Sequence, residues 1–132
     1  MPVLTYTTMS DPMGLTIGTG SGYDVSAETL ETIIDLAIDA LNLFGADLGN
    51  LTGTAGAKSL SCTSAEKGAI LIVARAVYYS FYKNVQGASI GGITVTANDL
   101  MKDPGTLQLI KDAARALQAG ADEEGLTGIL VG

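Results

Sequence analysis

Residues 64–84 read SAEKGAILIVARAVYYSFYKN and hold the clearest structural signal in this 132-residue chain. Thr63 and Glu66 frame the start as a capping box, in which a hydroxyl and a carboxylate bind each other's backbone amides. Between the first and last turns, the one charged residue is Arg75. The apolar residues form two adjacent ridges, Ile70, Val73, Val77 and Phe81 on one and Ala69, Ile72 and Ala76 on the next. A helix that is apolar on nearly every side is buried on nearly every side, and two more helices can cover only part of it. We expect the remainder to form a subunit interface.

Further helices are predicted on both sides of this one. Residues 26–44 start with Ser26 as N-cap, carry an apolar stripe at spacings of three and four, and end before Gly45. Asp103-Pro104 is a typical helix start, and the helix runs to about Ala119. Residues 98–102 fit a short helical turn. The expected fold class is mainly α, a small bundle of three main helices with one short β-hairpin.

The hairpin is predicted at about residues 87–96, where the apolar spacing changes to two. Ile90 ends one short strand, Gly91 and Gly92 form the turn, and Ile93 to Thr96 form the second strand. Glycine allows the positive φ that such a turn needs. Because an isolated hairpin is marginal in water, we expect this one to pack on another surface.

The expected organisation is one helical domain, residues 25–120, between two tails. Residues 1–24 show no helical period and are rich in Thr, Gly and Ser, which predicts an extended N-terminal arm. Residues 45–62 are glycine-rich and read as a loop, and residues 121–132 form a C-terminal tail.

Composition excludes several kinds of chemistry. The chain has no histidine and one cysteine, Cys62. Imidazole catalysis, histidine metal sites, multi-thiolate metal sites and an intrachain disulfide are therefore excluded. We expect no enzymatic activity and no cofactor. The longest apolar run, Gly68–Ala74, is far shorter than the roughly 20 residues that cross a bilayer, so no membrane association is expected.

The excess charge lies in one half of the chain. The net charge is −7, and residues 1–57 contain acidic residues but no Lys or Arg, while residues 58–132 contain all seven bases. Such an acidic surface repels phosphates and cannot supply the basic footprint of a nucleic-acid reader. It suits a surface past which nucleic acid slides without sticking.

Glu31, Asp35 and Asp39 repeat at a spacing of four in the first predicted helix. Like charges at this spacing weaken an isolated helix slightly. One interpretation is a channel wall or a face that pairs with bases of a neighbouring subunit, and the other is a solvated face. A metal site is disfavoured, because cations prefer ligands that converge from a loop.

Two apolar clusters are candidates for contact with partners. The C-terminal tail places Leu126, Ile129, Leu130 and Val131 behind three acidic residues. It either inserts into a partner, which we favour, or folds back over its own helices. Tyr78, Tyr79 and Tyr82 lack the surrounding bases of a single-strand stacking platform, so core or interface packing is expected.

Residues 85–117, VQGASIGGITVTANDLMKDPGTLQLIKDAARAL, resemble the head-to-tail connector adaptors of long-tailed double-stranded DNA bacteriophages. The resemblance rests on the order of elements across residues 27–119 and on Ile90-Gly91-Gly92-Ile93-Thr94-Val95. It implies a ring, usually twelve-fold, between the portal and the stopper or tail components, with DNA passing through its centre. It further implies that Ile90, Gly91, Gly92, Ile93 and Val95 contact ring neighbours. The C-terminal segment with Leu126, Ile129, Leu130 and Val131 would dock onto the portal.

The function predicted from the sequence is therefore that of a structural virion protein. It would assemble in the host cytoplasm, as a homo-oligomeric ring at the head-tail interface. Its partners would be the portal, a stopper or tail-terminator protein and, by proximity, packaged double-stranded DNA. The alternative is a cytosolic helical module that binds one protein partner and has no role in virions.

Overall fold

The computed structural model describes residues 3–18, 22–83 and 96–119. A two-residue strand β1 (Val3–Leu4) leads into helix α1 (Tyr6–Met13). Helix α2 (Ala27–Leu43) is followed by a long loop that contains strand β2 (Leu60–Ser61). Helix α3 (Ser64–Val77) continues directly into a π-helical turn, η1 (Tyr78–Tyr82), and the described chain ends with α4 (Ala97–Met101) and α5 (Pro104–Gln118).

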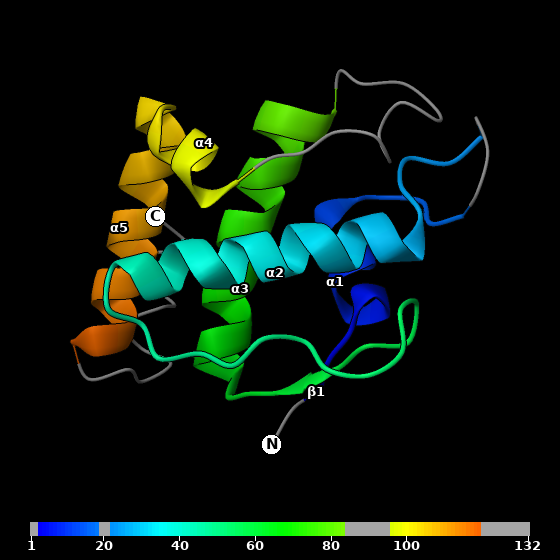
Figure 1. The fold of residues 1–132 in the computed structure, drawn as a ribbon, viewed down its shortest axis with the longest axis horizontal. Coiled ribbons are helices and arrows are strands. Elements are labelled where there is room, and N and C mark those ends of the chain that lie inside the picture. Colours follow the sequence, from blue (N-terminus) through cyan, green and yellow to red (C-terminus); the bar gives the residue numbers. More distant parts are fainter. Residues whose placement is uncertain (1–2, 19–21, 84–95, 120–132) are drawn as a thin grey trace.

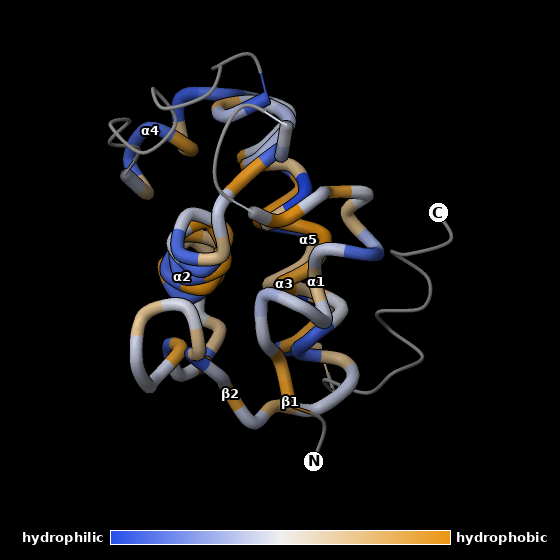
Figure 2. The backbone as a smooth tube through the Cα atoms, turned by 90° about the vertical axis from the view of Figure 1, so that its right-hand side faces the viewer, coloured by the Kyte–Doolittle hydropathy of each residue, from blue (hydrophilic) through white to orange (hydrophobic). Residues whose placement is uncertain are grey.

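The predicted fold class is confirmed: the protein is mainly helical, with one small antiparallel pair of strands. Helix α2 lies across α3 and α5 (Figure 1), and all three contribute to one core. Viewed from the side, α2 lies on one side of the molecule and α1, α3 and α5 on the other (Figure 2). The most completely buried side chains of the three long helices include Leu30, Ile33, Ile34, Ile38, Leu41, Ile70 and Ile110.

The long helices begin where the sequence predicts, because each has its own N-cap. The Ser26 hydroxyl accepts from Thr29 N (3.1 Å), and the Asp103 carboxylate accepts from Thr106 N (3.1 Å). Thr63 and Glu66 form the predicted capping box, with N–O distances of 3.1 and 2.8 Å. Such caps satisfy amides that have no partner within the helix. The helix starts could therefore be located without knowledge of the tertiary structure.

The second predicted helix is not a continuous α-helix up to residue 84. From Tyr78 its backbone widens into a π-turn, in which Lys83 N donates to Tyr78 O over 2.9 Å. This turn places the rings of both Tyr78 and Tyr82 in the core and leaves Tyr79 39% exposed. A π-turn accommodates one more residue than an α-turn and occurs often at functional sites.

The extended arm expected over residues 1–24 is wrong for residues 6–13, which form α1. Thr5 and Thr8 form a capping box at the start of α1, and Gly14 closes the helix with a φ of 72°. Met9 and Met13, four residues apart, point into the core, and Met9 is fully buried. Threonine has a low helix propensity, so this segment lacks the usual helical composition, and burial of its apolar side chains stabilises it instead.

The described strand pair is not the predicted hairpin. Val3 pairs with Ser61, and Leu4 pairs with Leu60, so the two strands come from opposite ends of a long stretch of chain. The hairpin predicted at residues 87–96 and the tail predicted at 121–132 lie outside the described residues.

Candidate interaction surface

The acidic row of α2 holds the long loop that follows this helix. Glu31 is only 2% exposed, and its two carboxylate oxygens accept from the backbone amides of Gly56 and Lys58, each over 2.8 Å. A buried carboxylate is tolerated when such hydrogen bonds replace its hydration. Glu31 therefore cannot line a channel or pair with a neighbouring subunit, and that interpretation is wrong for this residue.

The other members of the row bind the same loop closer to the surface. Asp35 Oδ1 accepts from Leu51 N (3.0 Å), and both Asp35 and Asp39 accept from the Asn50 side-chain amide. One turn later, Asn42 exchanges two hydrogen bonds of 3.0 Å with the backbone of Leu48. We call Glu31, Asp35, Asp39 and Asn42 the polar ladder of α2. Asp39 remains exposed, and contact between Asp35 or Asp39 and a neighbour stays a prediction.

The remaining sequence-predicted site residues cannot be placed relative to the ladder. Ile90, Gly91, Gly92, Ile93 and Val95 of the predicted hairpin lie outside the described residues, and so do Leu126, Ile129, Leu130 and Val131 of the tail. Their roles stay predictions.

The most distinctive described surface is a groove along α3, between α1 and α5. It has a volume of about 400 Å³. Its lining is Pro12 from α1, Leu109 from α5, and Leu71, Ile72, Arg75, Ala76, Tyr79 and Ser80 from α3 and its π-turn. We call it the α3 groove. The opposite face of α3 is fully packed in the core, so the groove is where this apolar helix is incompletely covered.

Tyr79 forms one end of the α3 groove, and two positively charged side chains lie beside its ring. Its hydroxyl donates to Met13 O (3.2 Å), which ties α3 to the end of α1. Arg75 Cζ lies 5.8 Å and Lys83 Nζ 5.0 Å from the ring centroid. Cations at these distances are attracted to an aromatic face. The groove thus combines an apolar floor with positive charge.

The cations of this face are available for a partner. In the described ranges the one ion pair is Asp112–Arg115, at 4.0 Å on α5, so Lys67, Arg75 and Lys83 have no carboxylate partner there. Lys67, Leu71, Arg75 and Tyr79 follow one another at spacings of four, and they form one ridge on the helix surface. This spacing is visible in the sequence, although the uniformly apolar composition of the segment obscures it.

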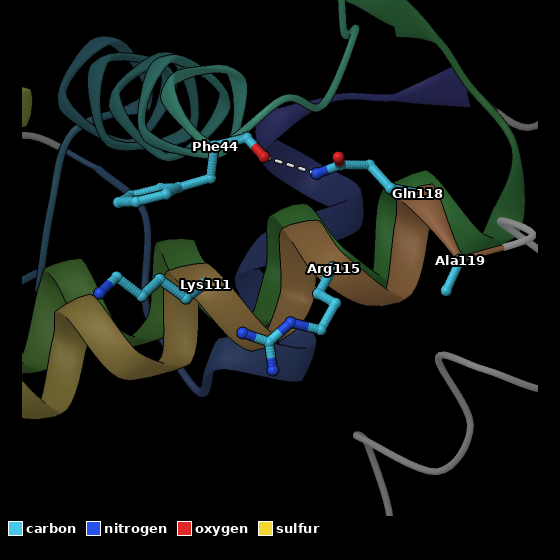
Figure 3. Close-up of a pocket in the computed structure, with 5 residues that line it drawn as sticks. All are labelled: Phe44, Lys111, Arg115, Gln118 and Ala119. Atoms are coloured by element: carbon cyan, nitrogen blue, oxygen red, sulfur yellow. Dashed lines mark hydrogen bonds between the residues drawn. The ribbon is translucent and has the colours of Figure 1, made fainter.

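A second groove lies on the other side of α5 (Figure 3), with a volume of about 540 Å³. It is lined by Phe44, Lys111, Arg115, Gln118 and Ala119. The Gln118 amide donates to Phe44 O across one end, and Lys111 Nζ lies 5.8 Å from the Phe44 ring centroid. Apart from Phe44 and Ala119, its lining is polar or charged, so it is a poorer match for an apolar segment.

The structure gives no support for catalysis at Cys62. This thiol is 2% exposed, and burial, followed by the charge of Glu66, raises its pKa, which disfavours the reactive thiolate. Across residues 3–18, 22–83 and 96–119, no cluster of Asp, Glu or Cys has the arrangement of a metal site. None of the helices in these ranges is both long and apolar enough to cross a membrane.

In comparisons with known proteins, no family model, no curated protein and no solved structure matches this chain.

Proposed function

We propose that this protein is the head-tail connector adaptor of a long-tailed bacteriophage. It would form a homo-oligomeric ring between the portal and the stopper or tail components, around the path of the DNA. The observation that carries the proposal is the α3 groove: an apolar helix in the centre of a small bundle remains open to a partner along one face. An incompletely covered apolar surface of this kind is typical of an interaction site.

Charge segregation supports a ring in particular. Besides the buried Glu31, helix α2 carries Glu28, Asp35 and Asp39 and no base, whereas α3 and α5 carry the four bases Lys67, Arg75, Lys111 and Arg115 and the two acids Glu66 and Asp112. Helix α2 lies on one side of the molecule, and α3 and α5 lie on the other (Figure 2). A ring repeats one heterologous interface, so each subunit needs two complementary faces. In the proposed ring, the α2 side of one subunit meets the α3–α5 side of the next.

The mechanism is burial of interfaces, with no covalent step. The α3 groove and the predicted hairpin would hold ring neighbours together, and the apolar C-terminal tail would dock onto the portal. The acidic half of the chain would keep the DNA path free of phosphate-binding bases. The sequence resemblance of residues 85–117 to phage adaptors supports this assignment of roles.

The test is binding of the purified chain to the portal protein encoded in the same genome, measured by light scattering after size exclusion. We expect a ring of this chain on the portal, and loss of that ring for Ile72→Glu in the α3 groove. Val3→Glu is the matched control, because Val3 is 49% exposed and lies on β1, outside the groove and outside α2. A chain that stays monomeric and does not bind the portal would contradict the proposal and favour a helical interaction module.

A further inference from the structure

We propose that in the free subunit the C-terminal segment 122–131 binds the α3 groove of its own chain. The proposed function assigns the groove and the tail to different partners, a ring neighbour and the portal. Before either partner is present, these two apolar surfaces would cover each other. The inference concerns the isolated chain and therefore does not depend on the adaptor role.

The first argument is the place at which the tail begins. Helices α3 and α5 are antiparallel: Ser80 Oγ near the end of one lies 3.4 Å from Thr106 Oγ1 near the start of the other. At the opposite end, Leu117 and Gln118 share a surface hollow with Thr63 and Glu66. The tail therefore leaves α5 beside the first turn of α3, where Lys67 begins the ridge that leads into the groove.

The second argument is length. An extended residue spans about 3.3 Å, so the chain can carry residues 122–124 at most roughly 10–17 Å from Ala119. From Lys67 to Tyr79 a helix rises about 18 Å. Seven extended residues, 125–131, span about 23 Å. The tail is thus long enough to follow α3 from Lys67 to the Tyr79 end of the groove in the same chain.

The third argument is the order of chemical types. Along the tail, Asp122, Glu123 and Glu124 come first and the apolar residues Leu126, Ile129, Leu130 and Val131 follow. Along the ridge of α3, Lys67 comes first, and the apolar floor with Leu71 and Ile72 follows. If the tail runs beside α3 in the same direction, its acids come close to Lys67, which has no described carboxylate partner. Its apolar side chains then lie on the apolar floor of the groove.

The groove on the other side of α5 is a weaker alternative. Lys111 and Arg115 could pair with the three acids, but Phe44 is the one large apolar side chain in its lining (Figure 3). Four apolar tail residues would find little cover there.

Disulfide trapping in the full-length chain tests the inference. In a Cys62→Ala background, Ile72→Cys is combined in turn with Leu126→Cys, Ile129→Cys or Leu130→Cys, so that different registers of the tail are sampled. Lys111→Cys with the same three partners is the matched control for the other groove. Oxidation is carried out at micromolar protein concentration, and products are separated on a non-reducing gel.

We expect an intramolecular disulfide in at least one Ile72 pair, and much slower formation in every Lys111 pair. Tethering gives the tail an effective concentration on the order of millimolar, so intramolecular trapping should outpace trapping between micromolar chains by about 100-fold or more. Dimers linked between chains would overturn the inference in favour of a second copy. Equal or faster trapping at Lys111, or no trapping at Ile72 in any register, would overturn it as well.

A charge exchange tests the proposed register. Lys67→Glu should slow trapping at Ile72, and adding Asp122→Lys and Glu123→Lys should restore the rate. Lys102→Glu, an exposed residue outside the ridge, should leave it unchanged. Since trapping is measured without a portal, its failure would leave the adaptor proposal standing, and failure of portal binding would leave the self-docked tail standing.

Discussion

At the scale of single residues, Glu31, Asp35 and Asn42 of the polar ladder bind backbone groups of the loop, and Asp39 binds the side-chain amide of Asn50. Glu31 binds two amides from a buried position, and this double contact fixes the turn around Gly56 and Lys58. The spacing of the acids was visible in the sequence, but their partners were not, because the loop lies far along the chain and takes part through its backbone. A solvated face and a loop-binding face have the same sequence pattern.

Glu31→Ala should lower the free energy of unfolding by about 2–3 kcal/mol, because two part-buried amides lose a charged acceptor. Glu31→Gln should cost less, roughly 1–2 kcal/mol, since one oxygen remains as acceptor. Urea unfolding of the purified variants measures both. Glu28→Gln, exposed on the same helix, is the control and should change stability by less than about 0.5 kcal/mol. Equal changes in the free energy of unfolding for Glu31→Gln and Glu28→Gln would contradict the role of Glu31.

Cys62 should react with a thiol reagent at pH 8 on the order of 100-fold more slowly in the folded chain than in urea. Access to a buried thiol requires local opening, and an opening that costs about 3 kcal/mol gives this factor. A reaction as fast in the folded chain as in urea would place the thiol at the surface.

The raised pKa of Cys62 also predicts a pH dependence of stability. Because folding favours the neutral thiol, its contribution is complete below the ordinary pKa of 9.0 and is lost as the pH rises through the higher pKa of the folded state. The free energy of unfolding should therefore fall more steeply above pH 9 for the natural chain than for Cys62→Ala. Parallel pH profiles would show that the thiol makes no such contribution.

At the scale of elements, the sequence predicted the three long helices because their signals are local. Ser26, Thr63 and Asp103 each cap a helix, and the apolar stripes repeat in phase. Helix α1 was missed because its stability comes from tertiary packing. The π-turn was missed for a related reason. It accompanies the burial of both Tyr78 and Tyr82 in the core, and no local sequence pattern predicts a π-turn there.

Met9→Ala should lower the free energy of unfolding by about 2–4 kcal/mol, because it leaves a cavity under α1. Asp11→Ala is the matched control on the exposed side of the same helix and should cost less than about 0.5 kcal/mol. Urea unfolding distinguishes the two. A similar small effect of both substitutions would mean that α1 does not contribute to the core.

The candidate site could be predicted only in part. The prediction that residues 64–84 keep an uncovered apolar face agrees with the α3 groove, but the contributions of Pro12 and Leu109 come from elements far away in the sequence. Lys67, Leu71, Arg75 and Tyr79 could have been found by their regular spacing. The occupant of the groove could not be identified from the sequence, since the shape and charge of a groove fit more than one partner.

At the scale of the whole molecule, the separation of charge predicts how the proposed ring responds to substitution. Glu28→Lys should weaken assembly on the portal, because Glu28 is exposed on the α2 side. Raising the salt concentration should weaken it too, since ions screen exposed charges over a Debye length of about 8 Å at physiological ionic strength.

Light scattering of the portal complex measures how much of the ring assembles. Combining the α2 variant with Arg75→Glu and Lys111→Glu on the neighbouring face should restore assembly. Lys102→Glu, at the residue that follows α4, serves as a control. Glu31 is unsuited to this experiment, because its reversal would disturb the loop. Assembly that is insensitive to all three reversals would remove electrostatics from the ring interface.

The polar ladder has a practical consequence for the loop that it binds. A carboxylate that accepts from a main-chain amide is indifferent to the side chain at that position, so the loop is anchored without regard to most of its composition. The constraints that remain are Asn50, whose side-chain amide donates to Asp35 and Asp39, the buried Leu51, and Gly53 and Gly56, whose φ values of 123° and 86° suit glycine. Thr54, Ala55 and Ala57 are exposed between and beside them and can be replaced by a fluorophore site or a short epitope, which would report on the molecule's surroundings while the bundle beneath stays intact.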